Sequence, residues 1–245
     1  MLRKAMDVLE LFSAARHELG VVETAQILGK SKSTTSRWLA AMEEAGFLER
    51  DGAGGRYRLS MRLAALGEVA RQSTSLQRLA RPALHRLRDA TGETSDLVVL
   101  TGEEAVNVDV VESPRPVKQV GWLGRRLPLH ATAAGKALVA WRSRDEVLRL
   151  LPSPLPRFTP STITDPEALL GELMAVRRRG YSTAVQELEE DLVGVAAPVR
   201  DLSGNVVAVL TVGAPVSRVP IARVPEVAVH VMREADSVSR GLGYR

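Results

Sequence analysis

The sequence predicts an α+β protein that consists of a small, mainly helical N-terminal domain with one β-hairpin, a helical linker, and a larger C-terminal domain in which helices flank an antiparallel sheet. Three observations support this prediction. Apolar residues recur at helical spacing in the first part of the chain, two short alternating segments then surround a glycine-rich turn, and strand-like and helical segments are mixed from Thr94 onwards. The expected boundaries are 1–60 for the first domain, 61–75 for the linker helix and 76–245 for the second domain.

The N-terminal domain is expected to contain three helices followed by the hairpin. The predicted elements are helices from Leu2 to near Ala15, at 21–28 and at 31–45, and strands at 47–50 and 56–59. Gly46 provides the stop signal for the third helix, and the glycine-rich turn at 51–55 joins the two strands. This order of elements is the layout of a winged helix-turn-helix domain.

The third helix is predicted to read DNA. Trp38, Leu39 and Met42 are expected to face the core, so the side chains on the opposite face point outward. Short hydroxyl side chains and long cations suit the major groove, because they bind phosphates or base edges. The predicted DNA-contacting residues are Lys30, Lys32, Ser33, Thr34, Ser36, Arg37 and, on the wing, Arg56.

The distribution of charge favours an anionic partner for the N-terminal part. Residues 1–90 contain 15 Lys and Arg against 10 Asp and Glu, whereas residues 91–245 contain 18 against 19. The excess positive charge therefore lies in the first third of the chain, which favours double-stranded DNA. Two alternatives stay open: the basic residues belong to an ordinary solvated helix face, and the hydroxyl residues at 31–35 only cap a helix.

The linker region at 61–91 is expected to form two helices with a break near Pro82. The remaining chain reads as a sheet flanked by helices. Its predicted strands lie at 95–101, 105–112, 117–122, 193–199 and 206–212, and its predicted helices at 132–141, 145–151, 164–180 and 222–241. A capping box at 164–167 opens the third of these helices, and Gly180 closes it.

Composition and motifs exclude several classes of function. The chain has no cysteine, which excludes disulfide scaffolds, thiol nucleophiles and zinc fingers. It shows neither a signal peptide nor an apolar run of bilayer length, so a cytoplasmic protein without a membrane partner is expected. The four histidines are scattered, His130 is expected to be structural, and no catalytic, metal-binding or cofactor motif is present. The chain is therefore not expected to be an enzyme.

Two runs of small residues, at 131–135 and 211–214, indicate places where the backbone could approach a small ligand closely. Tight packing of a helix on the sheet explains them equally well. Two other functions also stay open: an enzyme with a helical appendage, and a constitutive DNA-binding protein whose second domain only oligomerises.

Several segments of the chain resemble, in order, the IclR (isocitrate lyase regulator) family of bacterial transcriptional regulators. Residues 32–39 resemble the recognition helix of that family, and 46–59 resemble its wing. Residues 127–137, which read Leu-Pro-Leu-His-Ala-Thr-Ala-Ala-Gly-Lys-Ala, resemble the most specific stretch of its effector domain. The resemblance extends over nearly the whole chain.

The resemblance implies a ligand-responsive regulator, more often a repressor, that binds operator DNA as a homodimer or a dimer of dimers. Its C-terminal domain would be GAF-like and bind a small metabolite, such as a carboxylate or an aromatic compound. Ala184 and Gly194 stand where members often carry Asp and Cys, which favours a bulkier or less polar ligand. The implied effector-binding residues are Leu127, Ala133, Ala134, Ala184, Leu192, Gly194, Thr211 and Gly213.

Overall fold

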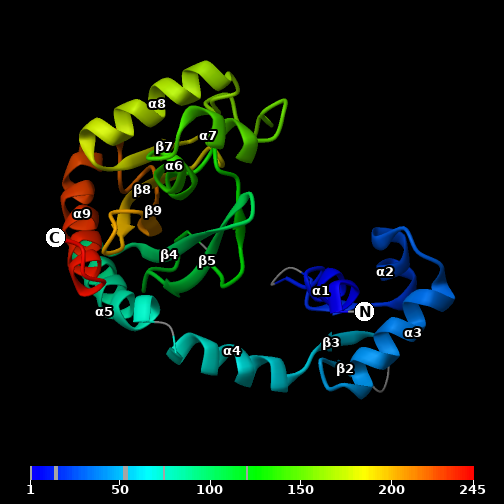
Figure 1. Ribbon diagram of the computed structural model, residues 1–245. Helices are drawn as coiled ribbons and strands as arrows, with labels where there is room; N and C mark the ends of the chain where they lie inside the picture. Colours follow the sequence, from blue (N-terminus) through cyan, green and yellow to red (C-terminus); the bar gives the residue numbers. More distant parts are fainter. Residues whose placement is uncertain (1, 14–15, 52–54, 74, 120) are drawn as a thin grey trace. The chain divides into compact units, whose positions relative to one another are not determined.

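The computed structural model describes residues 2–13, 16–51, 55–73, 75–119 and 121–245 (Figure 1). The chain divides into two compact units, Met1–Thr74 and Ser75–Arg245. Each unit has a hydrophobic core of its own. Among the described residues, no helix has both the length and the apolar content needed to cross a membrane.

The N-terminal unit is a winged helix-turn-helix, as predicted. Its elements are α1 (Leu2–Leu9), β1 (Glu18–Leu19), α2 (Val21–Leu28), α3 (Lys32–Glu44), β2 (Leu48–Arg50), β3 (Tyr57–Leu59) and α4 (Met61–Ser73). The hairpin strands β2 and β3 pair antiparallel, and β1 adds a third strand beside β3 that the sequence did not predict. A two-residue strand is too short to produce a recognisable pattern.

Helix α1 ends well before the predicted end near Ala15, a residue that lies outside the described part of the chain. Ser13 and Arg16 instead exchange two backbone hydrogen bonds, which turn the chain toward β1. At the other end of the domain, Gly46 has a φ of 76°, a left-handed conformation that suits glycine and ends α3. The hairpin tip at 52–54 also lies outside the described residues.

The predicted helix break near Pro82 is wrong. One helix ends at Ser73, and the next, α5 (Ser75–Thr91), contains Pro82 in its interior. Proline cannot donate a helix hydrogen bond and normally kinks or ends a helix. Here Ala83, Leu84 and Leu87 around it are fully buried in the core of the C-terminal unit, and this packing offsets the missing hydrogen bond.

The C-terminal unit is built on a six-stranded antiparallel sheet with the order β6-β5-β4-β9-β8-β7. Its strands are β4 (Thr94–Thr101), β5 (Glu104–Val111), β6 (Arg126–Leu127), β7 (Ser182–Val185), β8 (Leu192–Arg200) and β9 (Val206–Pro215). Its other helices are α6 (Ala133–Val139), α7 (Arg144–Leu150), α8 (Pro166–Arg179), the 3₁₀ helix η1 (Ile221–Arg223) and α9 (Val224–Gly241).

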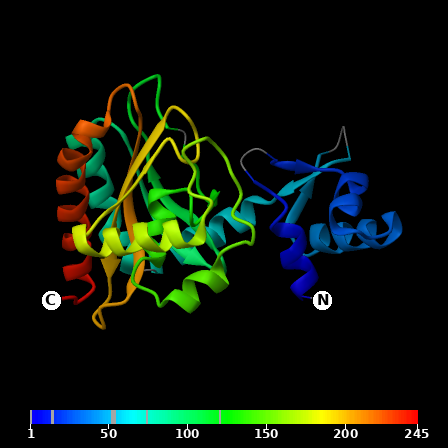
Figure 2. The same cartoon turned by 90° about the horizontal axis from the view of Figure 1, so that it is seen from above.

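Helices cover both faces of this sheet (Figures 1 and 2). Helices α5 and α9 pack on one face and α6 and α8 on the other, so the unit has two hydrophobic cores. Leu97 and Val98 show the alternation along β4, because the first is buried in one core and the second in the other.

The strand predicted at 117–122 is absent from the described residues of that segment, and β6 takes the edge of the sheet instead. Gly121 explains the difference, because a Cβ atom there would lie 2.6 Å from Asp96 Oδ1 and 3.1 Å from a methyl group of Val110. The segment therefore passes over side chains of β4 and β5 rather than pairing at the edge. A smaller correction concerns α8, whose N-cap is Asp165 rather than Thr164.

Candidate functional site

Helix α3 presents a polar face to solvent in the N-terminal unit. Its N-terminus is capped by Ser31, whose hydroxyl oxygen accepts a hydrogen bond from the Thr34 backbone N–H at 3.3 Å. Leu39 and Met42 are buried and Trp38 packs against the same core, as the sequence predicts. The side chains of Lys30, Lys32, Ser33, Ser36 and Arg37 are exposed, and that of Thr34 is half-buried.

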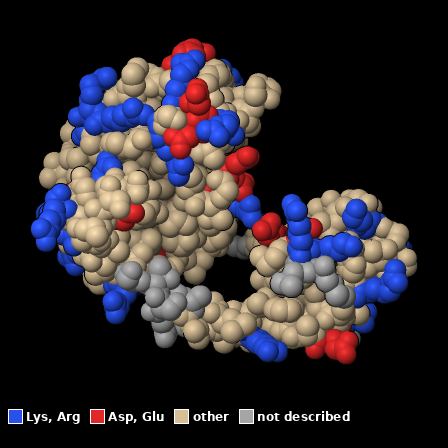
Figure 3. All heavy atoms as spheres, viewed as in Figure 1, with Lys and Arg blue, Asp and Glu red and all other residues tan. Residues whose placement is uncertain are grey.

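Arg56, which the sequence assigned to the wing, contacts other residues of its own unit. Its guanidinium group donates to the Glu18 carbonyl oxygen and to Glu23 Oε2, both at 3.0 Å. These bonds tie β3 to β1 and α2. Neighbouring Arg58 pairs with Glu49 at 3.2 Å. Figure 3 shows Lys and Arg side chains spread over the visible surface of this unit, with Asp and Glu among them.

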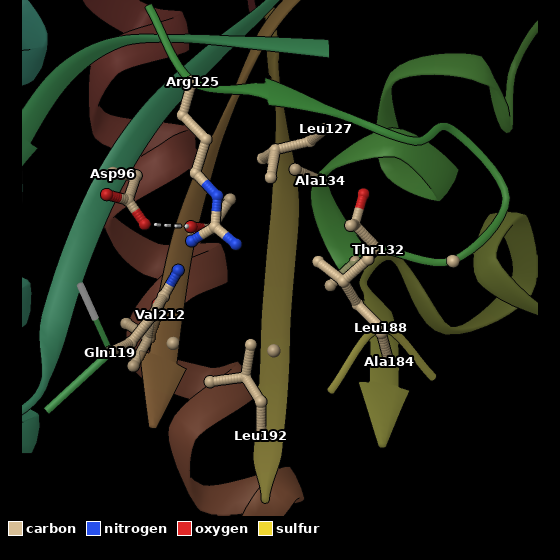
Figure 4. Close-up of a pocket in the computed structure, with 15 residues that line it drawn as sticks. Asp96, Gln119, Arg125, Leu127, Thr132, Ala134, Ala184, Leu188, Leu192 and Val212 are labelled. Carbon is tan, nitrogen blue, oxygen red and sulfur yellow. Dashed lines mark hydrogen bonds between the residues drawn. The ribbon is translucent and has the colours of Figure 1, made fainter. Parts of the chain in front are cut away.

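A small cavity lies between α6 and the sheet in the C-terminal unit. All eight residues that the resemblance implied as effector-binding line it: Leu127, Ala133, Ala134, Ala184, Leu192, Gly194, Thr211 and Gly213. Leu188 and Val212 complete its apolar walls (Figure 4). The cavity is therefore mostly apolar, as small-molecule sites usually are.

One side of the cavity is polar. Asp96 is 2% exposed, and its Oδ2 accepts a hydrogen bond from Thr211 Oγ1 at 3.2 Å. Burial raises the pKa of Asp96 to about 7, although the Thr211 hydrogen bond and the positive charge of Arg125 act in the opposite direction. Figure 4 shows the Arg125 guanidinium group beside Asp96, with Gln119 on the same side of the cavity.

Arg125 connects the polar side of the cavity to its rim. One of its Nη2 hydrogens is donated to Glu189 Oε1 at 2.9 Å, and its guanidinium carbon lies 4.7 Å from the Trp122 ring centre. The Arg125 side chain is 16% exposed, while that of Glu189 is 56% exposed. The guanidinium group in the cavity wall thus pairs with a carboxylate at the protein surface.

Two glycines allow the close approaches that make this cavity. A Cβ atom at Gly213 would collide with the Gln119 side-chain amide, and one at Gly194 would lie 3.2 Å from the Ala133 Cβ. The two glycines face one another on β9 and β8, at paired positions of the sheet. Any larger residue at Gly213 would therefore displace Gln119 from the polar side of the cavity.

Sequence reasoning missed Asp96, Gln119, Arg125 and Leu188 as lining residues. A signal existed for Asp96, which is the only charged residue of a strand that otherwise reads Thr-Ser-Leu-Val-Val-Leu-Thr. The others lie in segments between strands or at a strand end. Their position depends on how distant parts of the chain meet, and no local pattern reports it.

Other residues that the sequence singled out have structural partners. The His130 ring nitrogen Nε2 lies 2.8 Å from the Pro156 carbonyl oxygen, in agreement with a structural histidine. Glu187 is buried, and Lys136 Nζ donates to its Oε1 at 2.7 Å. Within the described residues, no group of His, Asp and Glu side chains is arranged to hold a metal ion.

Each of the two units matches a family of known proteins. The IclR helix-turn-helix domain matches residues 1–52, and the family model described as bacterial transcriptional regulator IclR C-terminal matches residues 69–240. The transcriptional regulator KdgR of Escherichia coli is 36% identical over 98% of this chain and 92% of its own. XynR of the same organism is 33% identical over 98% of this chain and 96% of its own.

Solved structures give the same result. The IclR-type regulator of Alicyclobacillus acidocaldarius matches with a TM-score of 0.90 and 27% identity, over 99% of this chain and 98% of the other. An IclR homologue of Microbacterium hydrocarbonoxydans, solved in complex with 4-hydroxybenzoate, matches with a TM-score of 0.85 and 31% identity, over 99% and 98% of the two chains.

A winged helix-turn-helix joined to a cavity-bearing domain, in a chain similar to the transcriptional regulators KdgR and XynR, defines a DNA-binding transcriptional regulator. Within that class, the chain belongs to the IclR family.

Proposed function

We propose that the chain is a repressor that binds operator DNA through α3 and that a small organic acid in the cavity modulates this binding. The observation that carries the proposal is the cavity itself, an apolar space between α6 and the sheet with Arg125 in its wall. The repressor role is supported by the transcriptional repressor IclR of Escherichia coli, which is 30% identical over 99% of this chain.

The exposed face of α3 supports the DNA-binding part of the proposal. Lys32, Ser36 and Arg37 lie on that face, where a major groove would meet them. Arg37 is proposed to contact a base and Lys32 a phosphate, because a guanidinium group can bind guanine with two hydrogen bonds. Ser33, Thr34 and Lys30 are proposed as backbone contacts. Arg56 is proposed to act near the DNA while it holds the wing to the unit.

Arg125 supports an acidic ligand. It is the positively charged residue among those that line the cavity, and a guanidinium group binds a carboxylate with two parallel hydrogen bonds. The apolar walls can hold an aliphatic or aromatic body. An aromatic acid is found in the Microbacterium hydrocarbonoxydans homologue, whose structure contains 4-hydroxybenzoate. The proposed effector class is therefore a small aliphatic or aromatic carboxylate.

Regulation requires that the effector binds two states of the protein unequally. We propose that the chain acts in the cytoplasm as a homodimer or a dimer of dimers and that effector binding changes how the paired α3 helices meet DNA. Exposed apolar side chains on α4 support an interface between copies, since Met61 is 74% exposed, Leu66 53% and Val69 65%. Sedimentation velocity of the full chain, alone and with DNA, measures the number of copies.

A salt titration of DNA binding tests the proposal. The DNA upstream of the chain's own gene is compared with an unrelated duplex of equal length, with and without candidate acids. A preference for the upstream DNA that persists at physiological salt, and that an acid weakens, supports the proposal. Equal binding to both duplexes that salt abolishes contradicts it. Specific binding that no acid changes favours a constitutive DNA-binding protein whose second domain only oligomerises.

A further inference from the structure

We propose that Lys136 is a positioning residue for the cavity: through its buried ion pair with Glu187 it holds residues 186–191 over the cavity, and a ligand enters when these residues move away. Residues 186–191 connect β7 to β8 and form the β7–β8 turn. The inference rests on the proposed function in one respect, because it takes the cavity to be a ligand site. Its test needs neither the effector nor DNA.

Lys136 and Glu187 form an ion pair that is almost completely removed from solvent. The Lys136 side chain is 1% exposed and that of Glu187 11%, and Lys136 Nζ donates to Glu187 Oε1 at 2.7 Å. A buried charge without a partner is strongly unfavourable, so each group needs the other while both are buried. Within the ranges that the structure describes, Glu187 Oε2 is buried without a hydrogen-bond partner. The carboxylate is therefore anchored through a single oxygen, Oε1.

The β7–β8 turn spans the cavity. Leu188 of this turn lines one side, where Figure 4 shows it beside Ala184. The next residue, Glu189, pairs with Arg125, which Figure 4 shows on the other side beside Asp96. Two successive residues of the turn thus contact opposite sides of the cavity. A ligand that passes at this place must displace the turn.

The ion pair joins the turn to the helix that forms one wall of the cavity. Lys136 lies on α6 two residues after Ala134, and Glu187 directly precedes Leu188. Both of these neighbours, Ala134 and Leu188, line the cavity. The contact between Lys136 and Glu187 therefore sets how closely the turn approaches α6.

The other contacts of the turn are hydrogen bonds that water can replace. Thr159 Oγ1 donates to the Gln186 carbonyl oxygen at 2.5 Å. Thr162 Oγ1 donates to that of Glu187 at 2.6 Å. Gln186 has a φ of 59°, a left-handed conformation that costs energy in residues other than glycine. Its N–H donates to the Leu192 carbonyl oxygen at 2.8 Å and closes the base of the turn. The turn can therefore move as a unit, with Gln186 as its hinge.

An ion pair suits a contact that opens. The closed turn removes both charges from water, and this cost offsets most of the attraction between them. The open turn returns both charges to water, so the two states differ little in free energy. Loss of the ammonium group alone leaves the Glu187 carboxylate buried and unpaired, which favours the open turn. Loss of both charges leaves an apolar contact, which favours the closed turn.

Thiol labelling of the full chain tests the inference, because the chain has no cysteine and each introduced cysteine reports on one position. Ala134→Cys places the reporter at a buried position of the cavity wall. Ser203→Cys, in the exposed connection between β8 and β9, gives the rate of an open site. With methyl methanethiosulfonate, a small uncharged reagent, Ala134→Cys is expected to react about 100-fold or more slowly than Ser203→Cys.

Substitutions of the ion pair are then added to Ala134→Cys. Lys136→Met keeps most of the side-chain length without the charge and is expected to raise the labelling rate about tenfold or more. Adding Glu187→Met to Lys136→Met is expected to return the rate to within about twofold of its starting value. Arg144→Met is the matched control, because it breaks the exposed ion pair of Arg144 with Glu167 and is expected to change the rate by less than about twofold.

A second reporter separates opening of the turn from a general loss of stability. Val199→Cys lies at the far end of β8 in the core beneath α5 and α9, and Lys136→Met is expected to leave its labelling rate unchanged. If Lys136→Met does not fold, hydrogen exchange of the unaltered chain provides the test. The hydrogen-bonded N–H groups of Gln186 and Leu192 are then expected to exchange about tenfold or more faster than those in the middle of β9.

The inference is overturned if Lys136→Met leaves the labelling of Ala134→Cys unchanged, or if it accelerates Val199→Cys equally. It is also overturned if the variant without either charge stays as fast as Lys136→Met, or if the turn exchanges no faster than β9. Each of these results leaves the acid-binding proposal standing. If labelling behaves as expected while no acid changes DNA binding, the proposed function fails and the movable turn remains.

Discussion

Arg125 and Glu189 form an ion pair in which Nη2 and Oε1 are 2.9 Å apart, and this pair joins the wall of the cavity to the turn between β7 and β8. Leu188, the residue before Glu189, lines the same cavity. A ligand carboxylate bound to Arg125, as proposed, would compete with the carboxylate of Glu189 for the same guanidinium group.

Glu189→Gln is expected to increase the affinity for an acidic effector about two- to fivefold, because an exposed ion pair contributes about 0.2–1 kcal/mol and its loss removes one carboxylate that competes for Arg125. Calorimetric titration with the tightest-binding acid measures the change. Glu104→Gln is the matched control, since Glu104 pairs with neighbouring Arg126, which does not line the cavity. Unchanged or weaker binding by Glu189→Gln would show that the carboxylate does not bind Arg125.

Asp96 is expected to make stability depend on pH. Its pKa is about 7 in the folded chain and 3.8 in its ordinary environment, so between these values only the folded state holds the proton. The free energy of unfolding therefore decreases as the pH rises from about 4 to about 7. Asp96→Asn removes this dependence while keeping an oxygen for Thr211, and is expected to gain about 3 kcal/mol relative to wild type between pH 5 and pH 8.

Urea unfolding at pH 5 and pH 8 measures the free energy of unfolding of wild type and of Asp96→Asn. If the difference between the two proteins is the same at both, Asp96 titrates as an ordinary carboxylate, and its burial has no consequence for stability.

Arg37 and Lys32 are both exposed on α3, and their substitutions are expected to have different effects on DNA binding. Arg37→Ala is expected to weaken operator binding by about 1–3 kcal/mol and to relax the preference at one base pair. Lys32→Ala is expected to weaken binding to all sequences equally and to reduce the salt dependence by about one counterion. Gel-shift titrations on operators with single base changes, at several salt concentrations, separate the two. Equal loss on every sequence for Arg37→Ala would assign Arg37 to the DNA backbone.

Two glycines in helices predict opposite effects of alanine. A Cβ atom at Gly135 in α6 would overlap the Leu129 backbone, so Gly135→Ala is expected to destabilise the C-terminal unit by about 1–3 kcal/mol or more. Nothing lies within 4 Å of a Cβ at Gly171 in α8, so Gly171→Ala is expected to stabilise the unit by about 0.5–1 kcal/mol. Denaturant midpoints of the two variants measure both changes. A loss of stability in Gly171→Ala would contradict the prediction that α8 has room for a methyl group at this position.

Local signals in the sequence predicted most of the helices and strands. Ser31, Gly46 and Gly180 mark helix ends in the structure as they do in the sequence, because capping depends on a few neighbouring residues. The prediction of a helix break at Pro82 was wrong because the burial of neighbouring residues outweighed the tendency of proline to end a helix. The prediction of a strand at 117–122 was also wrong, because the path of this segment is set by its packing against side chains of β4 and β5.

The site was predicted only in part. Family resemblance pointed to Thr211, Gly213 and the alanines of α6, which the structure gathers around one cavity. It did not point to Arg125 or Gln119. The hydrogen bond between Asp96 and Thr211 joins residues 115 positions apart, and no pattern in a single sequence reports such a pairing. The polar residues of the cavity wall could therefore be identified only from the folded structure.

The pairing of β4 with β9 also affects when the protein can respond to its ligand. These central strands come from opposite ends of the C-terminal unit, so the face that carries Asp96 stays without its partner until the ribosome has released the last strand. A nascent chain that ends before Val206 has no site to occupy, and the effector cannot help it to fold. Pairing between such distant segments also slows folding, because a long loop must close first. The cell therefore obtains a responsive molecule only from a finished chain.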